Sequence, residues 1–482
     1  MNFKKNAAKA VWAIVLFILT YLFLFTLVFL FAALCITGGI CVFMLRPGFI
    51  SLLVGMGVGI LGLSVLIFLI KFLFKKHRSD TTHYAEIVRE QEPKLFGIID
   101  DVVGEIKVGF PKKVYLSEDV NAGVFYDSSF WSMFIPVPKN LNIGLGLINS
   151  VTVQEFKSIL AHEFGHFSQK SMKIGSYVYN VNMVIHNMLY DNESFEKAVR
   201  HWAQISGIFS FFVWIAAMII RGIQWVLLKL YDYLNVKYLA LSREMEFNAD
   251  EVAANITGYM PVKEALLRTD LSKYAYDVVL NFYEGKIPEN KKSKNIYREH
   301  QFVMNFLAED MDIPMKNGFP LVSGYDLNKY NRSKLNIKDQ WVSHPTTAER
   351  IMALEKQGVE REYDSKYDKP AVSLLTGAEE TEQKMTEKLF EKVSYKEEPS
   401  FLSYEDFIAE LSEVYLKNFP DIYNDYYNDR NPALFDPENI VCEDSDETIG
   451  TLFSKTAVER VYNSLGLEND IHILNDIAGK IF

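Results

Sequence analysis

The chain has 482 residues, a formal net charge of −11 and three cysteines, and 49% of its residues are hydrophobic. This length allows one large domain or two. The acidic balance, with no basic patch or phosphate-binding glycine loop, argues against nucleic-acid binding. Cys35 and Cys41 lie in one apolar stretch and Cys442 is far from them in sequence, so we expect no disulfide framework.

The N-terminal region contains two long apolar runs. Residues 10–45 and residues 47–70 contain no charged side chain. Each run exceeds the about 20 apolar residues that span a bilayer. We therefore expect residues 1–78 to form two transmembrane helices joined by a short turn. A cleaved signal peptide has a shorter apolar run and is not followed at once by a second span, so we expect both helices to be retained.

Basic residues flank the outer ends of this predicted helical pair, whereas the turn contains only Arg46. Under the positive-inside rule, both ends and the domain that follows face the cytoplasm. We therefore expect an integral protein of a bacterial-type inner (plasma) membrane. The flanking basic residues are Lys4, Lys5, Lys9, Lys71, Lys75, Lys76 and Arg78.

A metal-binding motif, HExxH, occupies residues 162–166. It lies in a predicted helix, residues 152–170, which starts with a capping box of Thr152 and Glu155. His162 and His166 would lie one turn apart on one face and bind one cation, with Glu163 placed to accept a proton from water. A motif this short also arises by chance. Two histidines are not a complete ligand set either, because catalytic zinc has three protein ligands.

A candidate third ligand follows about eighty residues downstream, in a helical segment that contains Glu246 and Asp250. These carboxylates are separated by four residues and share a helix face. One carboxylate that binds the metal and a second that orients a histidine would fit this spacing. A solvated acidic helix face is the alternative.

An apolar stretch, residues 205–231, separates the two halves of this candidate site. His166 and Glu246 must reach one ion on one side of the membrane, so the chain between them crosses an even number of times. Arg221 interrupts the stretch, and charges within spans are costly. We predict a helical hairpin over about 172–256, with arms near 172–200 and 204–256, that enters or crosses the membrane and returns. The second arm would continue into the helix that contains Glu246.

The remaining sequence predicts helices over 262–283 and 297–310, separated by a charged linker. Residues 352–482 contain 29 acidic and 13 basic side chains, whereas residues 1–351 contain 32 and 37. An amphipathic helical pattern at 401–415 and several aromatic residues beyond it indicate an added, mostly helical region. We place this acidic extension at 371–482. It could control access or recruit a partner, or it could be only a solvated acidic surface.

Four segments together resemble the HtpX-like and CAAX-prenyl-endopeptidase superfamily of integral-membrane zinc metallopeptidases, over roughly residues 1–355. They are HEFGHFSQ, then SREMEFNAD, then a His-Pro element at residues 343–351, and upstream an Asn-Ala segment at residues 121–126 that follows a predicted strand at 113–116. The resemblance implies a zincin-like, mainly α fold with a small β-sheet. The peptidase domain would occupy residues 79–370.

The same resemblance implies a role for each matching residue. One zinc ion would be held by His162, His166 and Glu246, with Asp250 hydrogen-bonded to a ligating histidine. Glu163 would be the general base. His344 and Arg350 would be catalytic residues near the reacting centre, with His344 stabilising the oxyanion. Alternatively, His344 only caps a turn before Pro345, and Arg350 only pairs with a carboxylate. An extended substrate would pair with the strand near Asn121, Ala122 and Gly123.

The implied function is hydrolysis of peptide bonds in membrane-associated or misfolded proteins, so the expected partners are polypeptide substrates and the lipid bilayer. Three alternatives remain. The chain could be an inactive membrane scaffold with a peptidase fold, which the intact ligands argue against. It could process prenylated proteins, an activity associated with relatives that have more membrane spans. It could also be a transporter component, although only two spans are clear from the sequence.

Overall fold

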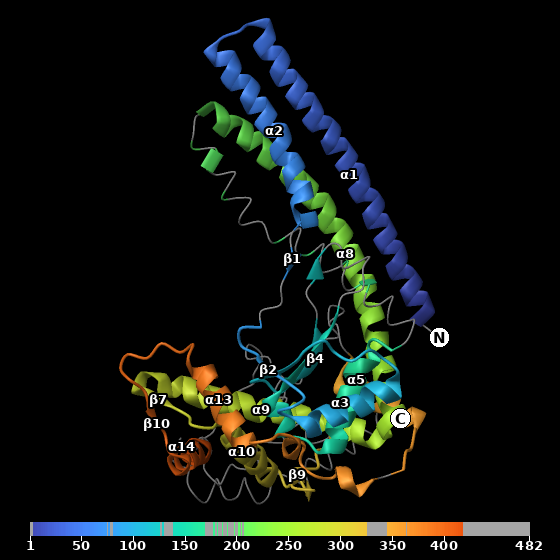
Figure 1. The fold of residues 1–482 in the computed structure, drawn as a ribbon, viewed down its shortest axis with the longest axis vertical. Helices are drawn as coiled ribbons and strands as arrows, with labels where there is room; N and C mark the ends of the chain where they lie inside the picture. The colour runs from blue at the N-terminus through green and yellow to red at the C-terminus, as the bar shows by residue number, and fades with distance from the viewer. Residues whose placement is uncertain are drawn as a thin grey trace, which may run out of the picture.

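A long helical stalk projects from a body of shorter helices and a small sheet in the computed structural model (Figure 1). The structure describes residues 3–74, 76–77, 81–125, 128–129, 138–168, separate positions between 177 and 204, and residues 207–324, 345–362 and 364–417. The stalk consists of α1 (Phe3–Leu45), α2 (Phe49–Phe74) and the first part of α8 (Gly207–Thr257). Each of these helices is long and apolar enough to cross a membrane.

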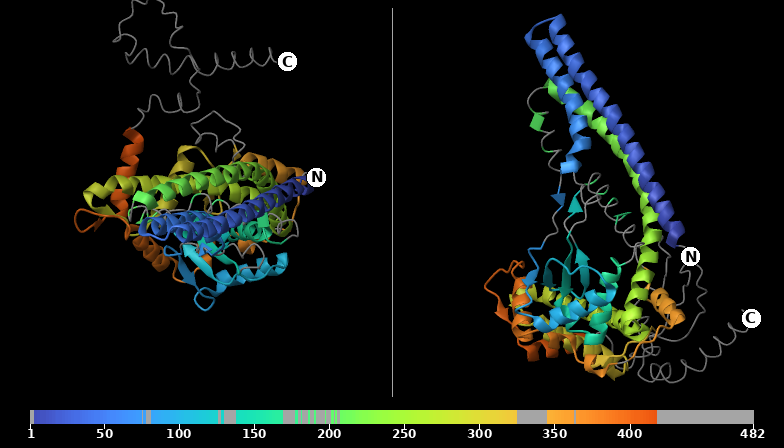
Figure 2. Two further views of the ribbon diagram at one scale, coloured as in Figure 1. Left: turned by 90° about the horizontal axis from the view of Figure 1, so that it is seen from above. Right: turned by 45° about the vertical axis from the view of Figure 1, so that its right-hand side comes forward.

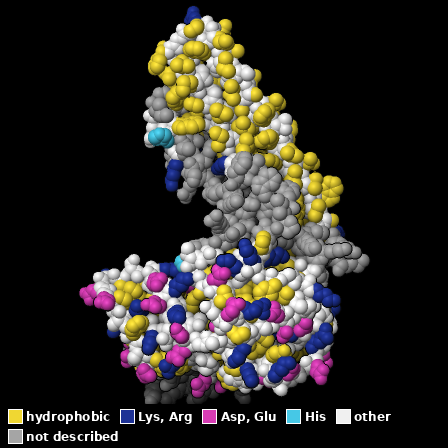
Figure 3. All heavy atoms as spheres, in the orientation of Figure 1, with side chains coloured by type: hydrophobic (Ala, Val, Ile, Leu, Met, Phe, Trp, Pro, Cys, Tyr) yellow, Lys and Arg dark blue, Asp and Glu magenta, His cyan; other side chains and the backbone are white. Residues whose placement is uncertain are grey.

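Glycine residues allow the stalk helices to approach closely. A Cβ atom at Gly39 of α1 would lie 2.4 Å from the carbonyl oxygen of Gly55 on α2, and one at Gly57 would lie 2.3 Å from the ring of Phe212 on α8. Hydrophobic side chains cover the visible surface of the stalk, whereas acidic and basic side chains are interspersed over the body (Figure 3). This distribution is that of a membrane-inserted stalk and an aqueous body.

Helix α8 is continuous over 51 residues and joins the stalk to the body. It corresponds to the predicted second arm at 204–256, whereas the first arm, near 172–200, lies largely outside the described residues. The HExxH segment is in the body, and α8 begins high in the stalk, where Phe212 contacts Gly57. Helix α8 therefore supplies one passage along the stalk between His166 and Glu246, and the predicted even number of crossings stays a prediction because residues 169–206 lie largely outside the described part of the chain.

A four-stranded sheet forms one part of the body, in the order β2-β3-β6-β4. Strands β3 and β6 are parallel, and the other two pairs are antiparallel. The predicted strand at 113–116 is β3, and the Asn-Ala segment leads into the edge strand β4. The sheet packs on α3 (Pro93–Ile106) and α5 (Val153–Gly165) through one apolar core. The strands are β2 (Ala85–Ile87), β3 (Val114–Ser117), β4 (Ala122–Phe125) and β6 (Asn140–Gly144), and the short α4 (Leu145–Ile148) follows β6. A separate antiparallel pair joins β1 (Lys76–His77) and β5 (Ser128–Ser129).

Helices downstream of α8 complete the body. The predicted helices at 262–283 and 297–310 are α9 (Tyr259–Lys286) and α10 (Ile296–Asp310), and α12 (Thr347–Gln357) follows the His-Pro element. The predicted charged linker contains η2 (Ile287–Glu289) and β7 (Lys291–Lys292). Strands β8 (Met315–Lys316) and β9 (Phe319–Pro320) form a small hairpin, and η3 (Ser365–Tyr367) lies beyond α12.

The described part of the acidic extension shares the core of the body. Phe407 stacks on Tyr283 of α9 and Phe390 meets the same ring edge-on, and Leu402 and Met385 are buried in the same cluster. Strand β10 pairs in parallel with β7. The predicted amphipathic helix near 401–415 is α14, and residues 418–482 lie outside the described part of the chain. The elements here are η4 (Ala371–Leu374), α13 (Ala378–Phe390), β10 (Ser400–Phe401) and α14 (Tyr404–Lys417).

Candidate metal centre

The helix that contains HExxH, α5, begins as its sequence predicts but ends earlier than predicted. The capping box is confirmed, since the Thr152 hydroxyl accepts from the Glu155 backbone N–H and the Glu155 carboxylate accepts from the Thr152 backbone N–H. The helix ends at Gly165 rather than continuing to residue 170. A Cβ atom at Gly165 would lie 3.3 Å from the backbone of Ala249, so this glycine lets α5 and α8 approach closely.

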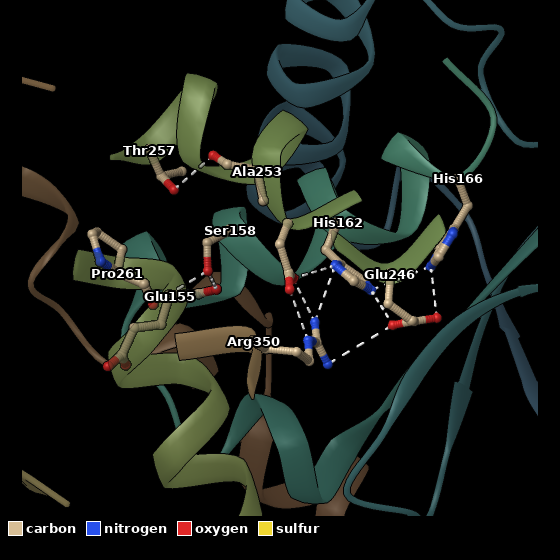
Figure 4. A network of polar contacts seen from close by, with 10 residues as sticks. Glu155, Ser158, His162, His166, Glu246, Ala253, Thr257, Pro261 and Arg350 are labelled. Carbon is tan, nitrogen blue, oxygen red and sulfur yellow. Dashed lines mark hydrogen bonds and ion pairs between the residues drawn. The ribbon is translucent and has the colours of Figure 1, made fainter. Parts of the chain in front are cut away.

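This contact of α5 with α8 brings three candidate ligands together. The Nε2 atoms of His162 and His166 are 3.2 Å apart, and the Glu246 carboxylate lies 3.4 Å from the first and 3.6 Å from the second. Figure 4 shows both imidazoles and the carboxylate converging on one point. One ligand atom from each of the three residues lies within 4.8 Å of the others.

A second group of side chains orients His162. Its Nδ1 lies 2.9 Å from Asp250 Oδ1. Arg350 of α12 donates two hydrogen bonds to the same carboxylate, from Nε to Oδ2 over 2.8 Å and from Nη2 to Oδ1. Asp250 therefore engages one ring nitrogen of His162 and leaves the other facing Glu246, which is the arrangement expected of a metal-binding histidine.

Helix α12 is itself fixed against α8. Thr346 and Glu349 form a second capping box at its start. The Glu349 carboxylate also accepts two hydrogen bonds, 2.9 and 3.0 Å long, from Arg243 of α8. These contacts place Arg350 within 3.9 Å of Glu246 as well.

Glu163 is a half-buried carboxylate at the edge of this cluster. Burial raises its pKa above the ordinary value, although the neighbouring His162 and a hydrogen bond to the backbone of Val124 on β4 lower it. For the two histidines the balance differs. Burial lowers both pKa values, but hydrogen bonds to Asp250 and Glu246 raise that of His162 overall, whereas the neighbouring His162 lowers that of His166 further.

A cleft of about 530 Å³ opens onto these groups. One wall is a stripe on α9 whose members recur at helical spacing and change from apolar to polar along the helix: Val262, Ala265, Leu266, Thr269, Asp270 and Lys273. Thr347 of α12 also lines the cleft, and its hydroxyl donates to Asp270 over 2.7 Å. The sequence interpretation missed this stripe. Its i, i+3, i+4 spacing could have revealed a shared face, but not that the face borders the metal site.

The predicted site residues are brought together in most cases. His162, Glu163, His166, Glu246, Asp250 and Arg350 all line the cleft, as do Asn121 and Ala122 at the start of β4. Gly123 lies next in β4 but is not among the lining residues. His344 lies outside the described residues.

The donor set fits a zinc ion. Two imidazoles and one carboxylate with room beside them match the three protein ligands and one open position of catalytic zinc sites. The Asp250–His162 contact supplies the carboxylate–histidine pairing that accompanies such ligands.

Comparison with known proteins shows the family of this chain. The model of peptidase family M48 matches residues 92–357, more than half of the chain. The chain belongs to peptidase family M48. Family M48 consists of zinc metalloproteases, so the chain is a protease by descent, and its apolar helices make it an integral membrane member of the family.

The relatives in family M48 are distant. The "Protease HtpX homolog" of Tropheryma whipplei strain TW08/27 is 23% identical over 285 residues, which cover 57% of this chain and 75% of the relative. The protein of strain Twist matches to the same extent. Among solved structures, S. mikatae Ste24p is 17% identical with a TM-score of 0.26, over 68% of this chain. This match spans 64% of the Ste24p chain, slightly less than two thirds of it.

Proposed function

We propose that this protein is a zinc endopeptidase of the plasma membrane that hydrolyses peptide bonds of membrane-associated or misfolded proteins on the cytoplasmic side. The observation that carries the proposal is the convergence of His162, His166 and Glu246 beside the half-buried Glu163 in an open cleft. The basic residues at the ends of α1 and α2 support the cytoplasmic orientation.

His162, His166 and Glu246 would hold the metal, which supplies a Lewis acid for a peptide carbonyl and lowers the pKa of water. Asp250 keeps the ring of His162 in the orientation that directs Nε2 to the site. Arg350 neutralises Asp250 and fixes its position. We assign Arg350 this positioning role because its guanidinium is committed to the carboxylates of α8.

Glu163 is the general base in this proposal. As a carboxylate it takes a proton from the attacking water, and it then gives that proton to the amine that leaves when the peptide bond breaks. The burial that raises its pKa makes it a better proton acceptor than an exposed glutamate.

Strand β4 supplies the substrate-binding edge. Within the described residues it pairs with β6 on one side, and Asn121 and Ala122 line the cleft. An extended peptide could add to this edge and lie across the metal centre, where backbone pairing gives affinity with little sequence preference. A broad substrate range follows.

The test compares the wild type with Glu163→Gln, both purified in detergent, for bound zinc and for cleavage of casein. We expect stoichiometric zinc in both proteins and a loss of cleavage in the variant of about 10²- to 10⁴-fold, as is typical of removing a general base. Wild-type protein that cleaves casein without bound zinc would contradict the proposal.

A further inference from the structure

Helix α8 is anchored in the membrane by one half and holds a metal ligand with the other. Its apolar first half ends at Lys229 and Asp232, which are both exposed. Glu246 lies further along the same helix without a break. At about 1.5 Å per residue, the segment from Lys229 to Glu246, here called the strut, is about 26 Å long.

The neighbouring helix places the membrane surface at the same level. Phe212 of α8 contacts Gly57 of α2, and from there both helices run toward the body (Figure 2). Lys71 ends the apolar part of α2 about 21 Å below this contact, and Lys229 lies about 26 Å below it on α8. The apolar span of α2, Phe49–Lys71, has 23 residues, which at this rise gives about 34 Å and matches a hydrocarbon core of about 30 Å.

The strut is packed along its length and fixed to the body at its lower end. Along its length α1 packs on α8, and Ala10, Ile14 and Leu234 are buried in one cluster. At its lower end the Arg243–Glu349 pair and the contact of Gly165 with Ala249 fix α8 to the body. The distance from membrane to metal centre is therefore a property of the fold.

We infer that, because this strut separates the metal centre from the membrane, the protein cleaves a membrane-anchored substrate only beyond a minimum length of exposed chain. The inference rests on the proposed function. An extended chain spans at most about 3.3–3.6 Å per residue, so about eight residues must lie between the membrane surface and the scissile bond. The substrates are thus membrane proteins with unfolded segments outside the bilayer, and bonds next to a span are spared.

The lower part of α1 defines the competing geometry. Its side chains stay apolar down to Ala10, and Trp12 and Leu19 are exposed. A bilayer that followed α1 down to Lys9 would lie closer to Glu246, and fewer residues of exposed chain would then suffice. The charges of α8 favour the longer distance, because it leaves Arg221 as the one charged residue of α8 at the depth of the bilayer, whereas the shorter distance would also bury Lys229 and Asp232 in lipid.

The experiment uses the full-length, zinc-loaded protein in proteoliposomes. The substrate is one transmembrane helix followed by an unfolded segment made of repeats of a peptide that the enzyme cleaves in solution, and mass spectrometry maps the cut bonds. The matched control is the same segment without the transmembrane helix. We expect cuts in every repeat of the soluble control, and at least tenfold fewer cuts within the first eight residues after the span than further along.

Cuts within the first three residues of the anchored substrate, at the rate of the soluble control, would overturn the inference and support the geometry that follows α1. A wild-type protein that fails to cut the soluble control would instead contradict the proposed function, so the two failures are distinguishable. Glu163→Gln serves as the inactive control for both substrates.

Discussion

The stalk and the catalytic body bury different kinds of residues. Among the described residues of α1, α2 and the apolar half of α8, Ser64 is the one buried polar side chain. The body instead buries charged and hydrogen-bonded groups such as Glu155, Arg268, His300 and Asp250. A buried polar group in lipid has few partners and is costly, whereas the body connects such groups into networks. Helix α8 belongs to both regions, so one helix changes from a lipid-facing to a ligand-bearing sequence within the strut.

The largest effect is expected from removing the charge that α8 contributes to the metal centre. Glu246→Ala should lose zinc and reduce casein cleavage by more than about a hundredfold, beyond the 10–100-fold typical of losing a group that only orients a ligand. Zinc content by atomic absorption and the cleavage rate measure it. Glu251→Ala, an exposed carboxylate on the same helix, is the control and should keep both. Full zinc content in the Glu246 variant would remove this residue from the ligand set.

A large loss of stability is expected in the body from breaking a buried ion pair. Arg268 of α9 is 1% exposed and bonds both Glu155, in the capping box of α5, and the Pro320 carbonyl. Arg268→Met leaves the Glu155 charge buried without its partner, which typically costs about 3–5 kcal/mol. The thermal unfolding midpoint in detergent is the measurement.

The matched control lies on the same helix. Lys263 pairs with Glu355 at the surface, so Lys263→Met should cost at most about 1 kcal/mol. Equal shifts of the midpoint in the two variants would mean that burial of the Arg268 pair has no special weight.

The sequence predicted the apolar helices of the stalk and the residues that converge at the candidate metal centre, but not the contacts between distant segments. Apolar runs and the capping box are local signals, and the structure bears them out. Arg268 is different: one arginine in an amphipathic helix gives no sign that it is buried against Glu155, more than a hundred residues upstream. Gly165 is a second example, because the sequence gives no sign of its close contact with α8. The sequence predicted that α5 ends at residue 170 rather than at Gly165, because helical composition continues past the glycine at which α5 packs on α8.

A pH-dependent loss of stability should also distinguish the body from the stalk. Burial lowers the pKa of His300 to about 4 from its ordinary 6.5. The folded state resists protonation, so this contribution is present above pH 6.5 and is lost as pH falls toward 4. The difference corresponds to about 3 kcal/mol.

His300→Gln isolates this contribution from that of Glu299, whose pKa burial raises to about 7. Glu299 acts in the opposite direction, since its contribution is present below pH 4.5 and is lost as pH rises through 7. We expect the unfolding midpoint of the wild type to fall more steeply between pH 6.5 and 4 than that of the variant. Parallel curves for the two proteins would contradict the assignment.

The smallest effect is expected in the stalk, where two adjacent glycines offer an internal comparison. A Cβ atom at Gly39 would clash with the backbone of Gly55, whereas one at Gly38 meets nothing within 4 Å. Gly39→Ala should therefore cost about 1–3 kcal/mol through overpacking. Gly38→Ala should be neutral or stabilising, because alanine is favoured over glycine in helices by about 1 kcal/mol. Thermal melts followed by circular dichroism compare the two, and equal midpoints would contradict the close α1–α2 contact. Because the metal centre lies beyond the strut, both variants should cleave soluble casein at the wild-type rate; only cleavage of an anchored substrate depends on how the stalk holds the body away from the membrane.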